Sequence, residues 1–313
     1  MVRPGRERCA SLRGRGRVSL RPPAKINISL VVFQRREDGY HELHTVMGMI
    51  DLCDRLDIEG SETPGIQLEC GGIASPGGPD NLVYRAAEML AHEHHIEPAL
   101  KIRLNKEIPV GAGLGGASSD AASCLIGLNR FWKLDLSTEE LSQHAARLGS
   151  DVAFFLYGPV AQCTGRGETV QPLPVRCHRE LLLIIPNIHV STAYVYKNHS
   201  YQERRETERM DRVRHYLRDG NLDGLLQEGI NSLTPTCLRL FEPLAILRDR
   251  LEELGIGPVH MSGSGSCLFA SSDSKEQSAQ WAATIEAHKL ADVRMVQFLN
   301  HAEPFLEVHH ADI

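Results

Sequence analysis

Pro109-Val-Gly-Ala-Gly-Leu-Gly-Gly-Ala-Ser-Ser119 is the most informative segment of this 313-residue chain. Glycine fills four of the six positions from Gly111 to Gly116, so backbone N–H groups can turn toward a ligand without a Cβ in the way. Residues 117–131, rich in Ala, Ser and Leu, predict a helix directly after the loop. The first N–H groups of such a helix are unpaired and carry partial positive charge. Loop and helix together predict a site for a polyphosphate anion.

The loop differs from two better-known phosphate loops. It lacks the terminal Gly-Lys-Ser/Thr of the P-loop. A dinucleotide fold would place an acidic residue about 20 positions on, and the only candidate, Asp135, follows no obvious second strand. A tight strand-to-helix connection remains the alternative. A second glycine cluster, residues 262–266, favours a phosphate site shared by both loops.

The segments around the loop predict mixed secondary structure. Alternating apolar residues predict strands at residues 26–32 and 100–104. Asp80 or Asn81 caps a predicted helix over residues 83–92, and Ser137 with Glu140 forms a capping-box pattern before residues 138–148. Further predicted strands span 46–50, 55–58, 181–185 and 293–299, with helices over 202–218 and 244–254. Strands mixed with separated helices indicate an α+β fold in two lobes.

Composition excludes several classes of protein. The net charge is −6, without the basic excess that nucleic-acid binders usually carry. No apolar run approaches the roughly 20 residues that span a bilayer, so we expect no membrane partner. Eight scattered cysteines without a C-x-x-C pair indicate a reducing, cytoplasmic environment.

The N-terminus is unusually basic. Residues 1–17 hold six arginines against one acid, Glu7, and lack the apolar centre of a signal peptide. We predict a disordered extension with structure beginning at residue 18. An organellar transit peptide and a basic arm for nucleic acid are the alternatives.

Two charged residues stand in apolar surroundings. Lys25 lies inside an apolar strand, where it either points at a ligand or reaches solvent by snorkelling. Asp151 precedes the apolar residues 152–156, where it is either a helix N-cap or a general base. The residues alone leave both choices open.

Three separated motifs resemble the GHMP kinases, the superfamily of galactokinase, homoserine kinase and mevalonate kinase. Residues 109–119 with Asp120-Ala-Ala122 resemble its ATP loop. Pro23-Ala-Lys-Ile-Asn27 and Met261-Ser-Gly-Ser-Gly-Ser266 resemble its first and third motifs, and the likeness covers roughly residues 20–270. The resemblance implies an ATP-binding lobe like ribosomal protein S5 domain 2 over residues 18–175. A ferredoxin-like substrate lobe follows over residues 176–313, with the acceptor between the lobes.

The resemblance also implies roles for individual residues. Asp151 is the expected catalytic base and Lys25 the residue that polarises the acceptor hydroxyl, with ATP and Mg²⁺ as cofactors and Ser119 as a candidate metal ligand. We expect direct in-line transfer by a monomer or weak homodimer. The residues implied in ATP binding are Pro109, Val110, Gly111, Ala112, Gly113, Leu114, Gly115, Gly116, Ala117, Ser118 and Ser119.

A narrower resemblance concerns the acceptor. Asp38-Gly-Tyr-His-Glu-Leu-His-Thr-Val46 is similar to the branch of the superfamily that phosphorylates a cytidine diphosphate-linked polyol in the non-mevalonate isoprenoid pathway. This implies that Tyr40 stacks on the cytosine, that His41 hydrogen bonds to its edge, and that Tyr196 stacks from the other side. The remaining residues implied in acceptor binding are Asn27, Thr192, Gly263 and Gly265.

The chain departs from the superfamily pattern at four positions. Ser150 and Ala153 stand where Ala and Pro are usual, Ala117 where a further Gly is common, and Ser232 where Asp is common. We expect the small side chains to leave the site's shape intact. The alternatives are another GHMP kinase, of homoserine or mevalonate type, and a non-catalytic ligand-binding protein of the same fold.

Overall fold

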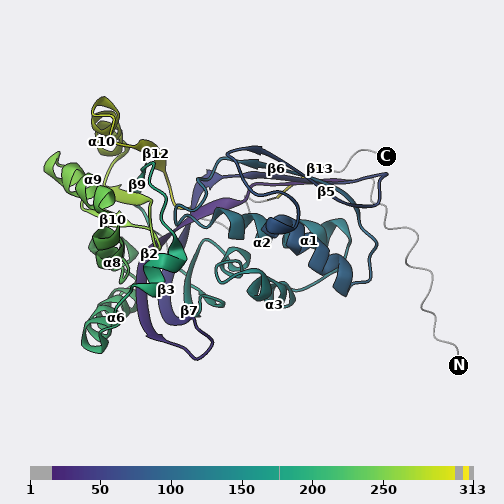
Figure 1. The fold of residues 1–313 in the computed structure, drawn as a ribbon, viewed down its shortest axis with the longest axis horizontal. Coiled ribbons are helices and arrows are strands. Elements are labelled where there is room, and N and C mark those ends of the chain that lie inside the picture. Colours follow the sequence, from purple (N-terminus) through teal and green to yellow (C-terminus); the bar gives the residue numbers. More distant parts are fainter. Residues whose placement is uncertain (1–15, 176, 300–305, 310–313) are drawn as a thin grey trace, which may run out of the picture.

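A computed structural model describes residues 16–175, 177–299 and 306–309. It has two lobes joined by a long pair of strands (Figure 1), which confirms the predicted α+β two-lobed architecture. The prediction for residues 1–15 lies outside this range. Arg17, expected in the extension, is the first residue of strand β1, where its guanidinium pairs with Asp57 at 2.8 Å.

The N-terminal lobe is a sheet covered by helices on one face (Figure 1). Its strand order is β13-β1-β4-β6-β5, and only β5 and β6 pair in parallel among these strands. Leu100, Ile102 and Leu104 point from β6 into the core, as their alternation predicts. The strands are β1 (Arg17–Leu20), β4 (Arg55–Gly60), β5 (Gly65–Gly72), β6 (Ala99–Lys106) and β13 (Leu306–His309).

Local capping signals position the helices of this lobe as predicted. The Asn81 side chain accepts a hydrogen bond from Val83 N, and Ser137 and Glu140 form the reciprocal capping box. The helix after the glycine loop begins at Gly116, one residue before the predicted start. The elements are the 3₁₀ turn η1 (Gly78–Asp80), α1 (Leu82–Glu93), α2 (Gly116–Phe131), α3 (Thr138–Leu148) and α4 (Phe154–Tyr157).

A second, antiparallel sheet runs between the lobes in the order β2-β3-β7-β8. The prediction of a half-buried strand at residues 26–32 is wrong, because β2 is buried continuously from Pro23 to Val32. Ile26 and Ile28 pack in one core cluster, and Leu30 and Val32 in another. The strands are β2 (Pro23–Arg35), β3 (His41–Cys53), β7 (Val160–Gly165) and β8 (Thr169–Pro172).

The C-terminal lobe is built on a third sheet, in the order β10-β11-β9-β12. The apolar run at residues 181–185 forms its buried strand β9, as predicted. The strands are β9 (Glu180–Ile185), β10 (Val259–Met261), β11 (Leu268–Ser272) and β12 (Asp292–Val296). The helices are α5 (Thr192–Lys197), α6 (Glu203–Arg218), α7 (Leu222–Glu228), α8 (Thr234–Leu240), α9 (Glu242–Glu253) and α10 (Lys275–Ala287).

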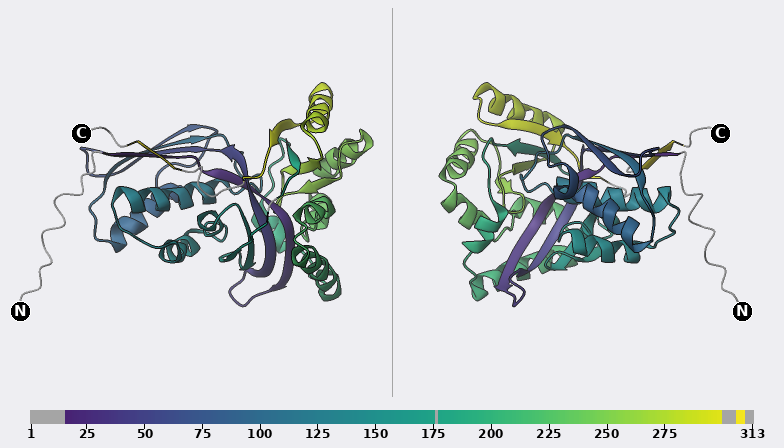
Figure 2. Two further views of the ribbon diagram at one scale, coloured as in Figure 1. Left: turned by 180° about the vertical axis from the view of Figure 1, so that it is seen from behind. Right: turned by 45° about the vertical axis from the view of Figure 1, so that its right-hand side comes forward.

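Strands β2 and β3 cross between the two lobes and connect them, as both views show (Figure 2). Ile26 and Ile28 share a core cluster with Leu181 and Leu183, so apolar packing is continuous across residue 175. After β12 the backbone returns to β3, where Leu299 N donates to Met49 O at 2.9 Å. Within the described residues, no helix is long and apolar enough to cross a membrane.

Candidate active site

The glycine loop lines a large cleft between the lobes. Residues 109–118 all contribute to this cleft, whose volume is about 1260 Å³. The loop also touches the second glycine cluster. The Ser262 hydroxyl donates to Gly113 O at 2.9 Å, and Cys267 N donates to Ala112 O at 3.1 Å. A Cβ on Gly113 would lie 2.3 Å from Ser262 O, and its φ is +79°, so this contact requires glycine.

Lys25 is held from β2 against the floor of the cleft. It is 3% exposed, and its Nζ donates to Asn27 Oδ1 at 2.6 Å and to Gly113 O at 3.0 Å. Asn27 Nδ2 in turn donates to Thr45 Oγ1 at 2.8 Å. The ammonium therefore does not snorkel to solvent but is fixed beside the glycine loop.

Asp151 faces Lys25 across the cleft. Its Oδ2 lies 3.6 Å from Lys25 Nζ, and its side chain is 39% exposed. Helix α4 has Ala153 as its N-cap and no side-chain capping bond, so Asp151 does not cap that helix. A cleft-facing carboxylate beside a fixed ammonium and a phosphate-type loop has the parts that phosphoryl transfer needs.

Comparisons with known proteins agree with this geometry. Family models for the GHMP kinases N terminal domain and the GHMP kinases C terminal match residues 81–159 and 206–288. A 4-diphosphocytidyl-2-C-methyl-D-erythritol kinase from Listeria innocua is 40% identical over 256 residues, which are 81% of this chain and 87% of the relative. The chain belongs to this family of GHMP kinases. The same enzyme from Shouchella clausii is 38% identical over 80% of this chain and 84% of its own length.

Solved structures of other GHMP-type kinases also resemble this GHMP kinase. A crystal structure of 4-(cytidine 5'-diphospho)-2C-methyl-D-erythritol kinase matches with a TM-score of 0.71 and 32% identity, covering 90% of this chain and 98% of the other. A homoserine kinase from Cytophaga hutchinsonii matches with a TM-score of 0.73 over 99% of this chain and 100% of the other. That match is only 18% identical, so it shows the fold alone.

Most of the residues predicted for the acceptor line the cleft of this GHMP kinase. Tyr40, His41, Thr192 and Tyr196 all line it. The ring centroids of His41 and Tyr196 are 5.8 Å apart, and burial raises the pKa of the Tyr196 hydroxyl. The exposed Tyr40 ring lies under the guanidinium of Arg166, 4.9 Å from its Cζ.

The second glycine cluster meets the cleft only in part. Gly263 and Ser264 line the cleft, and the Ser264 hydroxyl lies 2.8 Å from Thr192 Oγ1. Gly265 does not line it, because it packs against Met261 and Cys237 in the lobe interior. Its predicted place in acceptor binding is therefore indirect, through the shape of the loop.

A buried ion cluster under the glycine loop escaped sequence reasoning. Lys106 Nζ donates to Asp120 Oδ2 at 2.6 Å and also to Asp54, and all three residues are buried. Asp54 Oδ1 accepts from the backbone N–H groups of Glu107 and Ile108 at 2.6 and 2.8 Å, which fixes the entry to the loop. Burial raises the pKa of Asp120, because two carboxylates share one ammonium out of water.

This cluster had little sequence signal. Lys106 is the last residue of β6, and Asp54 is the single residue between β3 and β4, which are places where solvated charges are common. Only the position of Asp120, directly after the loop serines, marked one member. Arg166 and His199 also line the cleft and were not predicted.

Ser119 occupies a different place from its neighbours in the loop. It is fully buried and does not line the cleft, and its hydroxyl has no hydrogen-bond partner among the described residues. Asp120 Oδ1 is likewise buried without a partner. In the described part of the chain, no three His, Cys, Asp or Glu residues gather as a metal site.

The departures from the superfamily pattern leave the cleft open. Ser150 lines the cleft beside Asp151, and Ala153 is fully buried. Ser232 lies in the C-terminal lobe, where its hydroxyl donates to the buried carboxylate of Glu206 and accepts from Val32 N at 3.1 Å. Glu206 therefore places a carboxylate beside a position where the superfamily commonly has Asp.

Proposed function

We propose that this chain transfers the γ-phosphate of ATP to the 2-hydroxyl of 4-diphosphocytidyl-2-C-methyl-D-erythritol, in the non-mevalonate route to isoprenoid precursors. The proposal rests on the Lys25–Asp151 pair, 3.6 Å apart, beside a glycine loop and in the same cleft as Tyr40, His41 and Tyr196. It is supported by relatives with this activity in their names that are 40% and 38% identical.

In the mechanism that we propose, the acceptor hydroxyl attacks the γ-phosphorus in line with the leaving oxygen of ADP. Asp151 accepts the hydroxyl proton as the new P–O bond forms and the bond to the β–γ bridging oxygen breaks. The Lys25 ammonium stabilises the charge that develops on the transferred group. Since Asn27 and Gly113 already hold Lys25, little reorganisation is needed during the reaction.

The loop amides and the start of α2 hold the β- and γ-phosphates. Magnesium is the expected partner of these phosphates, and it would neutralise their charge. Two hard oxygen donors of the kind that magnesium prefers lack partners among the described residues, Asp120 Oδ1 and Ser119 Oγ. Asp120 lines the cleft, whereas the predicted ligand Ser119 is buried outside its lining, so Asp120 is the better placed of the two to hold the ion. Because phosphates supply most of the other ligands, a complete protein cage is not required.

The acceptor end of the cleft suits a cytosine. His41 Nδ1 lies 2.9 Å from Phe33 O and donates to it, which leaves Nε2 as an acceptor for the exocyclic amine of cytosine. Tyr40 and Tyr196 offer rings for stacking, and Arg166, in the same cleft, adds a positive charge that suits a diphosphate-linked acceptor.

We further propose that residues 18–175 form the ATP-binding lobe of a cytoplasmic enzyme and that the acceptor lobe follows from residue 176. The predicted end of the acceptor lobe at residue 313 is wrong, because β13 (Leu306–His309) pairs with β1 in the sheet of the N-terminal lobe. Seven cysteines in the described residues are free thiols, which supports a reducing compartment. A monomer or weak homodimer without nucleic-acid partners remains our expectation.

A substrate panel tests the proposal. Purified protein is given ATP and magnesium with the cytidine substrate, homoserine or mevalonate, and ADP release and product phosphate are measured. We expect turnover with the cytidine substrate alone. Phosphorylation of homoserine or mevalonate instead would assign another GHMP kinase activity, and no ATP turnover with any acceptor would favour a ligand-binding protein.

A further inference from the structure

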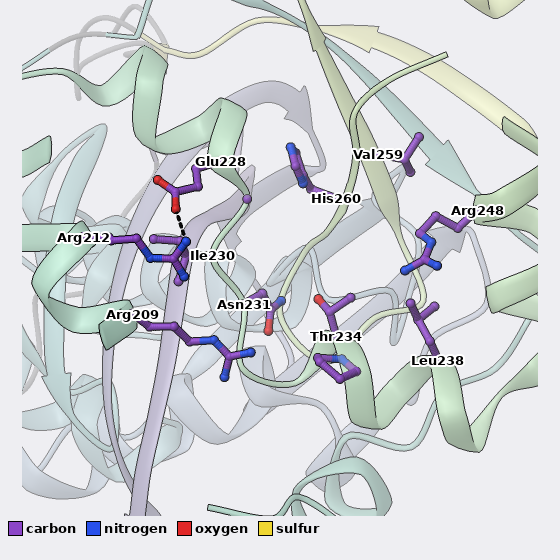
Figure 3. Close-up of a pocket in the computed structure, with 12 residues that line it drawn as sticks. Arg209, Arg212, Glu228, Ile230, Asn231, Thr234, Leu238, Arg248, Val259 and His260 are labelled. Atoms are coloured by element: carbon purple, nitrogen blue, oxygen red, sulfur yellow. Dashed lines mark hydrogen bonds and ion pairs between the residues drawn. The ribbon is translucent and has the colours of Figure 1, made fainter. Parts of the chain in front are cut away.

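A second pocket lies in the C-terminal lobe, lined by none of the residues of the catalytic cleft (Figure 3). Its volume is about 320 Å³, within the lower range of small-molecule sites. Helices α6, α7, α8 and α9 and strand β10 contribute to its walls. The mechanism proposed above uses no residue of this pocket.

Three arginines line the pocket. Arg209 and Arg212 come from α6, and Arg248 comes from α9. In Figure 3 the guanidinium groups of Arg209 and Arg248 point toward Thr234 from opposite sides. Three guanidinium groups around one concavity form a setting for an oxyanion, because their planar forks match phosphate oxygens.

Each arginine has one carboxylate partner, yet most of its N–H groups are unused. Arg209 Nη1 donates to Glu206 at 2.5 Å, Arg212 Nη1 donates to Glu228, and Arg248 donates from Nε and Nη2 to Asp249 at 3.1 and 2.6 Å. A guanidinium has about five N–H donors, so each keeps at least three beyond these bonds among the described residues.

Arg209 is the most firmly placed of the three. Its side chain is 12% exposed, and burial lowers its pKa. Its partner Glu206 is 1% exposed and is itself held by Ser232, which accepts from Val32 N. A second anion in the pocket would offset the cost of desolvating this guanidinium.

The remaining walls are apolar or uncharged. Ile230, Leu238 and Val259 are buried side chains that line the pocket, together with Thr234. His260 also lines the pocket, and burial lowers its pKa, so it adds no charge at neutral pH. Glu228 is the one carboxylate among the described residues of the lining, while Glu206 and Asp249, outside the lining, pair with Arg209 and Arg248.

We propose that this pocket binds the phosphate group of a small phosphorylated molecule, with Arg209, Arg212 and Arg248 on the phosphate oxygens and the apolar walls on its organic part. The site is separate from the catalytic cleft and independent of the activity proposed for it. Free phosphate shares the recognised chemistry, so the experiment compares the two sources.

Isothermal titration calorimetry with butyl phosphate and with inorganic phosphate tests the proposal. The full-length protein is first saturated with a non-hydrolysable ATP analogue, which blocks phosphate binding in the catalytic cleft. We expect one site for butyl phosphate. If butyl phosphate binds at least tenfold more tightly than inorganic phosphate, the ligand of the pocket is an organic phosphate ester, because the apolar walls contribute to its affinity. Equal affinities would make free phosphate the ligand. Absence of binding by both probes would overturn the proposal.

A double variant connects any binding to this pocket. Arg212→Gln with Arg248→Gln removes two exposed or half-exposed guanidinium groups, and we expect affinity to fall at least tenfold. The control, Arg204→Gln with Arg214→Gln, removes two charges from the solvent face of α6, the helix that holds Arg212. It should bind the phosphate probes as tightly as the parent protein does. Circular dichroism checks folding. Arg248→Gln alone repeats the test with less disturbance, because its partner Asp249 is largely solvated. Unchanged affinity in a folded pocket variant would place the ligand elsewhere.

Discussion

Replacing Gly113 with alanine should separate the two glycine clusters at the centre of the cleft. The new Cβ would lie 2.3 Å from Ser262 O, whereas real Cβ atoms essentially never come closer than 3.0 Å. One loop must therefore move by about 0.7 Å, the difference between these two distances. The backbone at Gly113 also has φ +79°, which costs an alanine about 1–2 kcal/mol.

The movement would disturb two hydrogen bonds that Gly113 O accepts, from Lys25 Nζ at 3.0 Å and Ser262 Oγ at 2.9 Å. Weakening the charged one costs about 1.5–3 kcal/mol, so together with the backbone strain we expect a loss of about 2.5–5 kcal/mol in the free energy of unfolding. Because Lys25 would move with respect to the bound phosphates, kcat should fall by about 100-fold.

Gly111→Ala provides the matched control. Gly111 has a similar φ of +72°, but its Cβ would meet only the His189 side chain at 3.8 Å. We expect this variant to lose only the roughly 1–2 kcal/mol of stability that backbone strain costs and to keep its kcat within a few-fold. Urea denaturation and steady-state kinetics measure both variants. If Gly113→Ala and Gly111→Ala proved equal in stability and rate, contact between the glycine clusters would not organise the site.

Three further outcomes are expected. Asp151→Asn should bind ATP normally but lose at least ~100-fold in kcat. The control Asp135→Asn, at an exposed residue, should keep the parent kcat. A kcat near that of the parent in Asp151→Asn would mean that Asp151 is not the catalytic base. Tyr196→Ala should raise the KM for the cytidine substrate more than it lowers kcat, because the lost stacking weakens binding by about 1–3 kcal/mol. A change in kcat alone would argue against stacking. Burial lowers the pKa of His44, so the folded state disfavours its protonation and loses stability as pH falls below about 6.5. His44→Gln should flatten urea-derived stability between pH 7 and 5, and an unchanged slope would mean that other groups dominate.

Local physics made much of the fold predictable. Caps such as Asn81 and the Ser137–Glu140 box act over a few residues, so the helices that they start were visible in sequence. Strand β9 was visible because its five apolar residues admit little besides a buried strand. Strand β5 carried no strand prediction, because it is an edge strand without a buried residue and so lacks an apolar pattern.

The glycine loop and the resemblance of three motifs identified the residues of the cleft in advance. They marked Asp120 but did not reveal its partners Lys106 and Asp54, which come from two other segments and look like solvated charges in one dimension. The same holds for Arg166, which reaches the Tyr40 ring from a distant turn.

By itself, the sequence determined which segments bend, cap and alternate, because those properties depend on each residue's own backbone freedom and its near neighbours. Only the tertiary structure decided the roles of Lys25 and Asp151. Whether Lys25 snorkels or is fixed, and whether Asp151 is a cap or a base, depends on what lies within a few ångströms of each side chain. Gly113 and Asp151, which both meet the Lys25 ammonium, are more than 80 residues from Lys25 in the chain.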